Sequence, residues 1–299
     1  MLEPTCHIPV LVDEVLQWLE PSPGKVFVDG TFGGGGHAKA LAQQVAPHGL
    51  VLGIDLDPGA IARSEQTLAT LPIQLVAGSY AEIPTILANQ HLAAVDGILL
   101  DLGLSSDQLA DPARGFSFLS AGPLDLRFDP ESGEPAWKLL QYCEEKRLAD
   151  IIFQYGEERY SRRIAKEIVA SRRASPIRTA DQLAELVRRC VPRSRGHQID
   201  PATRTFQALR IAVNEELTSL ELALKSLPEC LRPGGRFVII SFHSLEDRLV
   251  KHAFRNDDRL EVLTKKPVVA SDRESIENPR ARSAKLRVAQ RTAGNTSGN

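Results

Sequence analysis

Four consecutive glycines at 33–36 lie between the acid Asp29 and His37, and a further acid, Asp55, follows the run by 19 residues. Such a run permits positive φ angles and lets the backbone approach a ligand closely. An acid at this distance, at the end of the next strand, can accept hydrogen bonds from a ribose diol. Turn, helix and acid together predict a site for a ligand with a nucleoside part. A loose turn beside a surface acid is the plainer alternative.

The residues leave two kinds of ligand to be weighed. Gly33, Gly35 and Ala38 fit the spacing of a dinucleotide-binding turn, which alone is a weak pattern. A pyrophosphate needs a helix N-terminus aimed at it, and the chain offers no obvious partner for hydride transfer. S-adenosylmethionine has no phosphate and needs an acidic strand end near its amino-acid part, which Asp29 supplies. Asp101 and two following serines add polar groups at the sheet edge where such folds bind ligands.

These groups need a sheet to bring them together. Short apolar runs alternate with helical patterns through the first hundred residues. We expect strands at 25–30, 50–57, 73–77 and 95–102 and helices at 37–45, 58–71 and 81–91. Continuously apolar strands that alternate with helices indicate a parallel sheet covered on both faces. The fold class is therefore α/β, with a Rossmann-like, mostly parallel sheet.

The alternation of strands and helices stops after the fourth predicted strand. Residues 107–129 are rich in Gly, Pro, Asp and Ser and predict a loop, and helical patterns at 135–170 and 179–189 follow with no strand between them. This predicts an inserted helical domain at 111–205 within a core formed by 1–110 and 206–299.

The α/β rhythm then resumes. An apolar stripe from Phe206 to Leu227 predicts one long helix. A strand at 236–241 follows, and Ser244 with Asp247 predicts a capping box at the start of a helix over 245–255. Strands are expected at 260–264 and 284–289, the latter antiparallel at the sheet edge.

Composition places the chain among ordinary globular proteins. Its 299 residues are 42% hydrophobic and 25% charged. No apolar run reaches the roughly 18–20 residues that span a bilayer, and the N-terminus lacks a secretory pattern. Four scattered cysteines favour neither a zinc site nor a disulfide framework. We therefore expect no metal, no membrane partner and a cytoplasmic location.

The formal net charge of −2 conceals an asymmetry. Residues 159–195 hold eleven Lys or Arg and three acids, a net charge of +8, so the rest of the chain carries −10. A basic segment on an acidic body attracts phosphate. The alternative is a solvated helical face.

Motifs spread along the chain resemble one family closely. They are His7-Ile-Pro-Val-Leu11, Asp29-Gly-Thr-Phe-Gly-Gly-Gly-Gly-His37, Leu99-Leu-Asp-Leu-Gly103, Ser105-Ser106, Arg114-Gly-Phe-Ser-Phe118, Gly122-Pro-Leu-Asp125, Tyr155-Gly-Glu-Glu-Arg159, Pro201-Ala-Thr-Arg-Thr-Phe-Gln207, Ser241-Phe-His-Ser-Leu-Glu-Asp-Arg248 and Asn278-Pro-Arg-Ala-Arg-Ser283. The family is the bacterial ribosomal RNA small-subunit methyltransferase H family, also called MraW. The resemblance runs from His7 to about Arg291.

The resemblance implies a class I methyltransferase core with an inserted helical domain. It implies transfer of a methyl group from S-adenosylmethionine to N4 of one cytidine in small-subunit (16S) ribosomal RNA. The implied cofactor contacts are Gly35, Gly36, His37, Asp55, Asp101, Gln108 and, as an aromatic contact, Tyr80. Many amino-methyltransferases carry Asp/Asn-Pro-Pro-aromatic after the fourth strand. This chain has Asp101-Leu-Gly-Leu instead, so that scheme cannot be transferred to it.

Several residues are candidates for the chemistry and for the acceptor. Asp101 is the candidate general base, although it can equally serve only the cofactor. His37 and His243 are conceivable bases, with loop packing favoured for His243. Trp137 and Phe116 could stack on a base or pack in a core, and Arg204 could contact phosphate or form a structural salt bridge.

Rival functions stay open on the residues alone. One is a methyltransferase for DNA or protein, and another is a ribosome-assembly factor that binds the cofactor without turnover. The expected partner is ribosomal RNA or the small ribosomal subunit, and the sequence leaves the oligomeric state open.

Overall fold

The computed structural model describes residues 9–118, 121–192 and 200–293. The chain divides into two compact units. Unit 1 is drawn from Met1–Gly103 and Leu217–Asn299, and unit 2 from Leu104–Glu216. The chain passes from unit 1 to unit 2 after Gly103 and returns to unit 1 after Glu216. Left-handed backbone lies at or next to both points, at Gly103 (φ 91°) and Glu215 (φ 50°). The sequence places these crossings at 110/111 and 205/206, inside the segment that forms unit 2.

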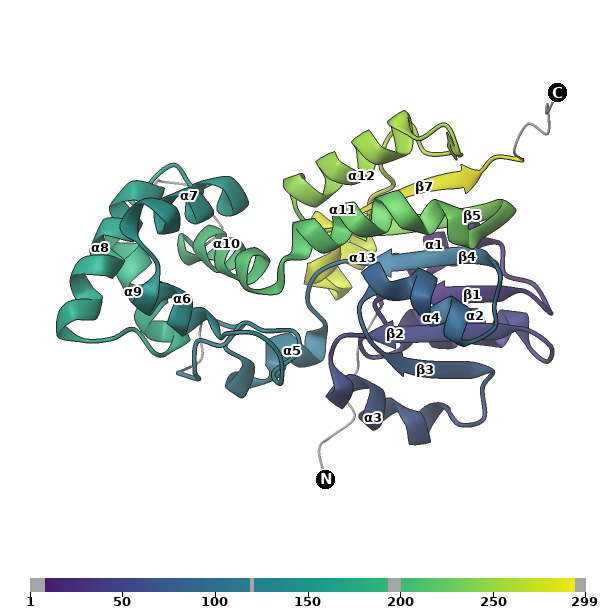
Figure 1. Ribbon diagram of the computed structural model, residues 1–299, viewed down its shortest axis with the longest axis horizontal. Helices are drawn as coiled ribbons and strands as arrows, with labels where there is room; N and C mark the ends of the chain where they lie inside the picture. Colours follow the sequence, from purple (N-terminus) through teal and green to yellow (C-terminus); the bar gives the residue numbers. More distant parts are fainter. Residues whose placement is uncertain (1–8, 119–120, 193–199, 294–299) are drawn as a thin grey trace. The chain divides into compact units, whose positions relative to one another are not determined.

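The described part of unit 1 contains a seven-stranded sheet in the order β3-β2-β1-β4-β5-β7-β6 (Figure 1). Its strands are β1 (Val26–Asp29), β2 (Leu50–Asp55), β3 (Ile73–Ala77), β4 (Val95–Asp101), β5 (Leu231–Ser241), β6 (Leu260–Val262) and β7 (Lys285–Arg291). The pairs from β3 to β5 are parallel, and β7 is antiparallel to both of its neighbours. The predicted α/β fold with a mostly parallel sheet is confirmed. The last strand is antiparallel, but it lies inside the sheet and not at its edge, so that part of the prediction is wrong.

Helices cover both faces of this sheet. They are α1 (Val12–Leu19), α2 (Gly36–Val45), α3 (Pro58–Leu68), α4 (Ile83–Asn89), α11 (Glu216–Ser226), α12 (Ser244–Asn256) and α13 (Asp272–Glu277). Buried side chains of α4, α11 and α12 form one core with the sheet, and those of α1, α2 and α3 form another. The sequence analysis did not predict α1 or α13, which are short, at eight and six residues.

The apolar stripe from Phe206 to Leu227 belongs to two helices and not to one. Glu215 adopts left-handed backbone and ends α10 (Ala202–Asn214), and α11 begins at the next residue. Phe206 and Leu209 enter the core of unit 2, whereas Leu220 enters that of unit 1. The apolar spacing continues from α10 into α11 because each helix buries one apolar face, α10 in unit 2 and α11 in unit 1.

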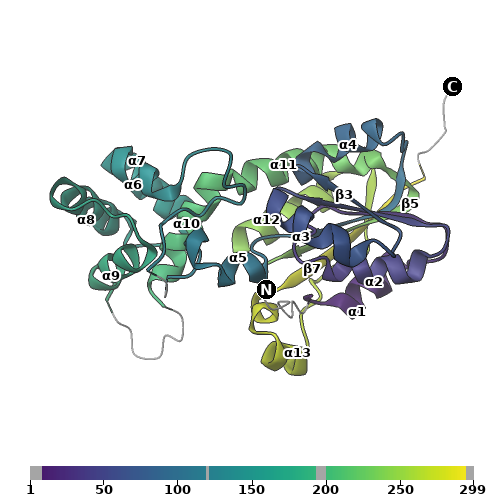
Figure 2. The ribbon, with the colours of Figure 1, turned by 90° about the horizontal axis from the view of Figure 1, so that it is seen from below.

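Unit 2 is helical around its own core (Figure 2). Its helices are α5 (Ser106–Ala110), α6 (Ala136–Tyr142), α7 (Glu145–Gly156), α8 (Ser161–Ala174), α9 (Ala180–Cys190) and α10. The segment predicted to be helical at 135–170 forms three helices, and the predicted loop at 107–129 contains α5 and a 3-10 turn. A Cβ atom on Gly156 would lie 2.4 Å from the carbonyl oxygen of Arg204, so glycine permits the close packing of α7 on α10.

Two observations concern the environment of the chain. In the part of the chain that the structure describes, no helix is long and apolar enough to cross a bilayer. Cys143, Cys190 and Cys230 are buried free thiols, and Cys6 lies outside the described residues.

Candidate active site

The glycine turn connects β1 to α2 at the carboxyl end of the parallel strands. Gly33 and Gly35 have φ angles of 53° and 75°, a region that L side chains rarely adopt. A Cβ atom on Gly35 would lie 2.6 Å from Cζ of Phe32. The turn is therefore a compact backbone segment that side chains at these positions would disrupt.

Asp55, at the end of β2, is tied directly to this turn. Its Oδ2 accepts a hydrogen bond from the backbone N–H of Gly33 at 2.7 Å, and its Oδ1 accepts one from Asp57 at 2.8 Å. Each carboxylate oxygen can accept a second hydrogen bond. Asp55 therefore holds the backbone of the glycine turn in place.

Three ionisable groups are buried where β1, α2 and β4 meet. Asp29 is 1% exposed and His37 5%, and the side chain of Asp101 is 8% exposed. Nδ1 of His37 lies 3.9 Å from Oδ2 of Asp101. Thr31 links the two acids, because its N–H donates to Asp29 and its hydroxyl accepts from the N–H of Asp101. The sequence did not single out Thr31, whose two contacts involve residues 2 and 70 positions away.

Burial sets the charges of this cluster. It raises the pKa of Asp29 to about 6 and that of Asp101 to about 7, with the His37 charge acting in the lowering direction on Asp29. Burial also lowers the pKa of His37, so its imidazole is neutral near pH 7. The cluster thus holds two carboxyl groups that titrate close to neutrality beside a neutral imidazole.

Each of the two acids keeps one oxygen without a hydrogen-bond partner among the described residues. These atoms are Oδ2 of Asp29 and Oδ1 of Asp101. A buried acceptor without a partner is costly and rare, and such atoms concentrate at sites that bind a ligand. Two acids able to carry negative charge suit a ligand that brings positive charge or hydrogen-bond donors.

The two remaining predicted cofactor contacts lie in different units. Tyr80 begins a 3-10 turn (Tyr80–Glu82) after β3 and packs against the unit 1 core. Gln108 is buried in unit 2, where its side chain accepts from the N–H of Ser105 in the capping box of α5. The sequence did not foresee this structural task for Gln108.

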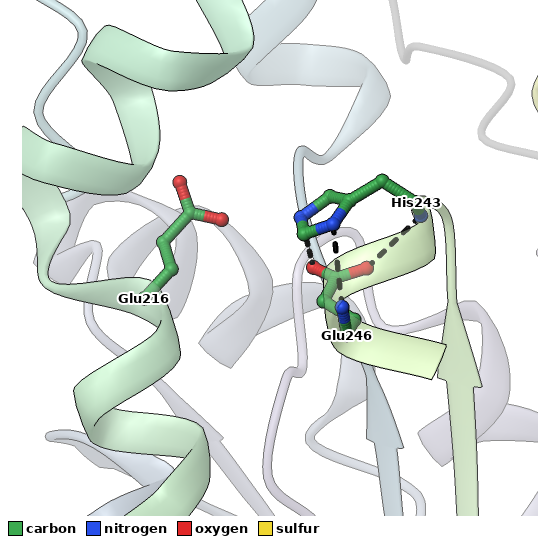
Figure 3. A group of neighbouring side chains, drawn as sticks. All are labelled: Glu216, His243 and Glu246. Carbon is green, nitrogen blue, oxygen red and sulfur yellow. Dashed lines mark hydrogen bonds and ion pairs between the residues drawn. The ribbon is translucent and has the colours of Figure 1, made fainter. Parts of the chain in front are cut away.

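His243 proves to be a helix cap. Figure 3 shows its ring facing Glu246, whose N–H donates to Nδ1 at 3.4 Å. Nε2 lies 3.1 Å from Oε1 of Glu246, and Oε2 accepts from the N–H of Phe242. The N-cap of α12 is therefore His243 with Glu246, one residue before the predicted Ser244. Glu216, also drawn in Figure 3, pairs in unit 2 with Arg210 at 2.7 Å.

The candidate acceptor residues lie in unit 2. Arg204 is exposed on α10. Trp137 is half-buried, and the guanidinium of Arg178 stacks on its ring at 3.7 Å from the centroid. Phe116 is a core residue, 5% exposed. Trp137 therefore already has a planar cation on one face, which a base would have to join or displace.

The basic segment 159–195 separates into structural and exposed cations. Arg172 donates to two carbonyls at the end of α6, and Arg188 pairs with Asp200 at 2.8 Å. Arg162, Lys166 and Arg173 are exposed on α8 and form no ion pair with any described residue. Their spacing of four and seven residues places them on one helix face. Arg193 and Arg195 lie outside the described residues.

Sheet order, glycine turn and acids at the ends of β1, β2 and β4 together define the class of protein. A sheet ordered β3-β2-β1-β4-β5-β7-β6 with antiparallel β7 is that of a class I S-adenosylmethionine-dependent methyltransferase.

The particular family follows from comparison with known proteins. The model of the MraW methylase family matches residues 4–292, and the chain belongs to this family. Proteins named ribosomal RNA small subunit methyltransferase H are similar to this chain over nearly its whole length, and those of three organisms serve as examples. The Rhodopirellula baltica protein is 52% identical over 298 residues, which is 96% of this chain and 92% of the relative. The Thermomicrobium roseum protein is 50% identical (97% and 94%) and the Deinococcus radiodurans protein 50% (96% and 90%).

Proposed function

We propose that this protein transfers a methyl group from S-adenosylmethionine to N4 of a cytidine in small-subunit ribosomal RNA, in the cytoplasm. The observation that carries the proposal is the pair of buried acids, Asp29 and Asp101, whose unpartnered oxygens stand beside the glycine turn. The names of the relatives support the acceptor, and the family supports methyl transfer.

The residues fit the methyl donor. The backbone of Gly35, Gly36 and His37 would border it, Asp55 would accept from its ribose, and Tyr80 would pack on its adenine. Asp29 and Asp101 would face its positive charges, and Gln108 is the contact proposed from unit 2. When bound, S-adenosylmethionine supplies an electrophilic methyl group on a sulfonium.

The chain must then make a poor nucleophile react. The lone pair of the cytosine amine is delocalised into the ring, and holding it in line with the methyl group contributes about 7–11 kcal/mol. We assign proton acceptance to Asp101, because a pKa near 7 leaves a substantial ionised fraction at neutral pH. A role limited to cofactor binding predicts instead that Asp101→Asn weakens cofactor affinity and leaves kcat unchanged.

Selection of the acceptor is assigned to the inserted helices, predicted at 111–205. The exposed cations of α8 would neutralise phosphates, and Arg204 would add another contact. Trp137 would stack on an accessible base, in exchange for or beside Arg178. A target base must be unpaired or turned out of its stack for N4 to reach the site.

The decisive experiment incubates the protein with isotopically labelled S-adenosylmethionine and isolated small ribosomal subunits. Digestion of the RNA should yield labelled N4-methylcytidine, and mapping in cells with and without the protein should identify one position. Label found only in protein or DNA would favour another acceptor. Cofactor binding without any transfer would favour an assembly factor.

The α8 surface has its own test. Charge reversal of Arg162, Lys166 and Arg173 to Glu should weaken RNA binding and reduce the slope of log K against log salt by about two, at roughly 0.7 per phosphate. Arg255→Glu, an exposed arginine of α12 in unit 1, is the control with the same type of charge change. An unchanged slope would show that this helix face is a solvated surface that does not contact RNA phosphates.

A further inference from the structure

The two ring nitrogens of His37 have different surroundings. Nε2 lies 2.9 Å from the backbone carbonyl oxygen of Val10. A carbonyl only accepts hydrogen bonds, so a neutral imidazole must carry its proton on Nε2. Nδ1 is then a lone pair, and it is this atom that lies 3.9 Å from Oδ2 of Asp101. Because burial keeps His37 neutral, the tautomer is set by Val10.

We propose that His37 is a positioning residue for methyl transfer, whose tautomer, fixed by Val10, withholds a proton from ionised Asp101 and accepts a hydrogen bond from protonated Asp101. The inference rests on the proposed function. With the opposite tautomer, an N–H would face the carboxylate, stabilise its charge and weaken it as a base. The observed tautomer has the reverse effect on both protonation states.

The proton balance follows from these positions. As the amine nitrogen bonds to the methyl carbon, the carbon–sulfur bond breaks and its electron pair stays on sulfur. The amine proton passes to the carboxylate of Asp101, whose Oδ1 has no partner among the described residues. Rotation about the Cβ–Cγ bond, a soft torsion, brings the new O–H to Nδ1 of His37. The proton leaves to solvent when the products depart.

The distance between Nδ1 of His37 and the Asp101 carboxyl must shorten before a hydrogen bond can form. A hydrogen bond between a carboxylic acid and an imidazole nitrogen requires roughly 2.6–3.2 Å, so the 3.9 Å separation between Nδ1 and Oδ2 is too long for one. The hydrogen bond is therefore expected whenever Asp101 is protonated, both by titration and after it accepts the amine proton, and it then stabilises the protonated state. Its effect is on catalysis and not on substrate binding.

Other charges also act on this pair. Arg280, in the 3-10 turn Pro279–Ser283, lowers the pKa of Asp101, and Glu246 of α12 raises it. Asp29 and Glu274 of α13 raise the pKa of His37, and Arg280 lowers it. Arg280, Glu246 and Glu274 are unchanged when His37 is replaced by a neutral residue, whereas the pKa of Asp29 depends on His37. The titration must therefore be measured on the Asp101 carboxyl alone.

His37→Gln is the discriminating variant, because the glutamine amide can still donate to Val10 but offers no acceptor at the Nδ1 position. Removing one hydrogen bond to the neutral acid should move the midpoint of Asp101 protonation to lower pH by about one unit. Difference infrared spectroscopy of the carboxyl band, with Asp101→Asn protein as the subtraction reference, measures this midpoint in full-length protein without substrate. His252→Gln, an exposed histidine of α12, should leave the midpoint unchanged.

Kinetics supply the second readout. His37→Gln should lower kcat about tenfold, shift the acid limb of the kcat–pH profile downward, and leave KM for S-adenosylmethionine within about twofold. In an Asp101→Asn background the same substitution should cost nothing further. An unmoved carboxyl midpoint, or an equal loss of rate in both backgrounds, would overturn the proposal. Because the infrared midpoint needs no acceptor, a failure of the RNA assignment would leave that result standing.

Discussion

Replacing Asp101 by Asn should stabilise the protein at alkaline pH, and it removes the proposed base. The folded-state pKa of Asp101 is about 7, against 3.8 for an ordinary aspartate carboxyl. The unfolded chain therefore loses this proton first. Between these two values the folded state binds more protons, so its free energy of unfolding falls as the pH rises. The stabilising effect of the protonated carboxyl is complete below pH 3.8 and is lost as the pH passes about 7.

The size of the effect follows from the same two values. About three pH units at about 1.4 kcal/mol each give a cost of about 4 kcal/mol at pH 8, and about 2 kcal/mol of that is already present at pH 5. Asparagine has nearly the same shape and does not ionise. The variant should therefore gain on the wild type by about 2–3 kcal/mol between pH 5 and pH 8. Asp29, whose pKa is raised to about 6, adds a slope of the same sign to both proteins, and its slope is smaller in the variant because the Asp101 charge contributes to that raised pKa.

Urea unfolding at pH 5 and pH 8 measures the free energy of unfolding of both proteins. Amide hydrogen exchange in β1 and β4 reports the stability of unit 1 separately. Asp258→Asn, at an exposed position of the same unit, should shift stability equally at the two pH values. If Asp101→Asn shows the same offset at pH 5 and pH 8, Asp101 is not a buried neutral acid, and its assignment as a base tuned to neutrality is wrong.

Three further substitutions test separate parts of the structure. Asp55→Asn should weaken S-adenosylmethionine binding by about 10–100-fold in calorimetry, because it removes a charged acceptor from the ribose and the glycine turn; unchanged affinity would contradict the ribose role. Gly35→Ala should lose cofactor binding and destabilise unit 1, since φ is 75° and Phe32 lies in the way; a normal melting temperature would show that the turn can relax. Gly156→Ala should destabilise unit 2 by about 1–3 kcal/mol in denaturant, because the methyl group would meet the carbonyl of Arg204; a gain in stability would mean that helix propensity outweighs the clash.

The sequence predicted those features that local pattern decides. Continuous apolar runs identified β1 to β4, and the glycine run with Asp55 at the end of β2 identified the turn, because strand ends of a parallel sheet share one edge. The pattern failed where one periodicity served two cores. Nothing in the stripe from Phe206 to Leu227 marks Glu215 as left-handed, because the backbone change is imposed by packing in two different units.

The electrostatics of the site were beyond the reach of the sequence for a different reason. Asp101 was a candidate base by its place at a strand end, but its pKa depends on burial among residues from several segments. The tautomer of His37 depends on the backbone carbonyl of Val10, 27 residues away. A main-chain oxygen has no signature in a sequence, so such a contact becomes visible only in the fold.

The stability of the fold gives a reason to regard this cluster as functional. Two acids that are buried, partly unpartnered and raised in pKa destabilise the protein at neutral pH. Neutral residues of similar shape at both positions would make unit 1 more stable, so packing does not account for the acids. A ligand that brings positive charge to the sheet edge reverses the balance, since it favours the ionised state that burial opposes. On the proposed function, the energetic cost in the free protein is the counterpart of binding a positively charged ligand, which leaves Asp101 ionised and able to accept a proton.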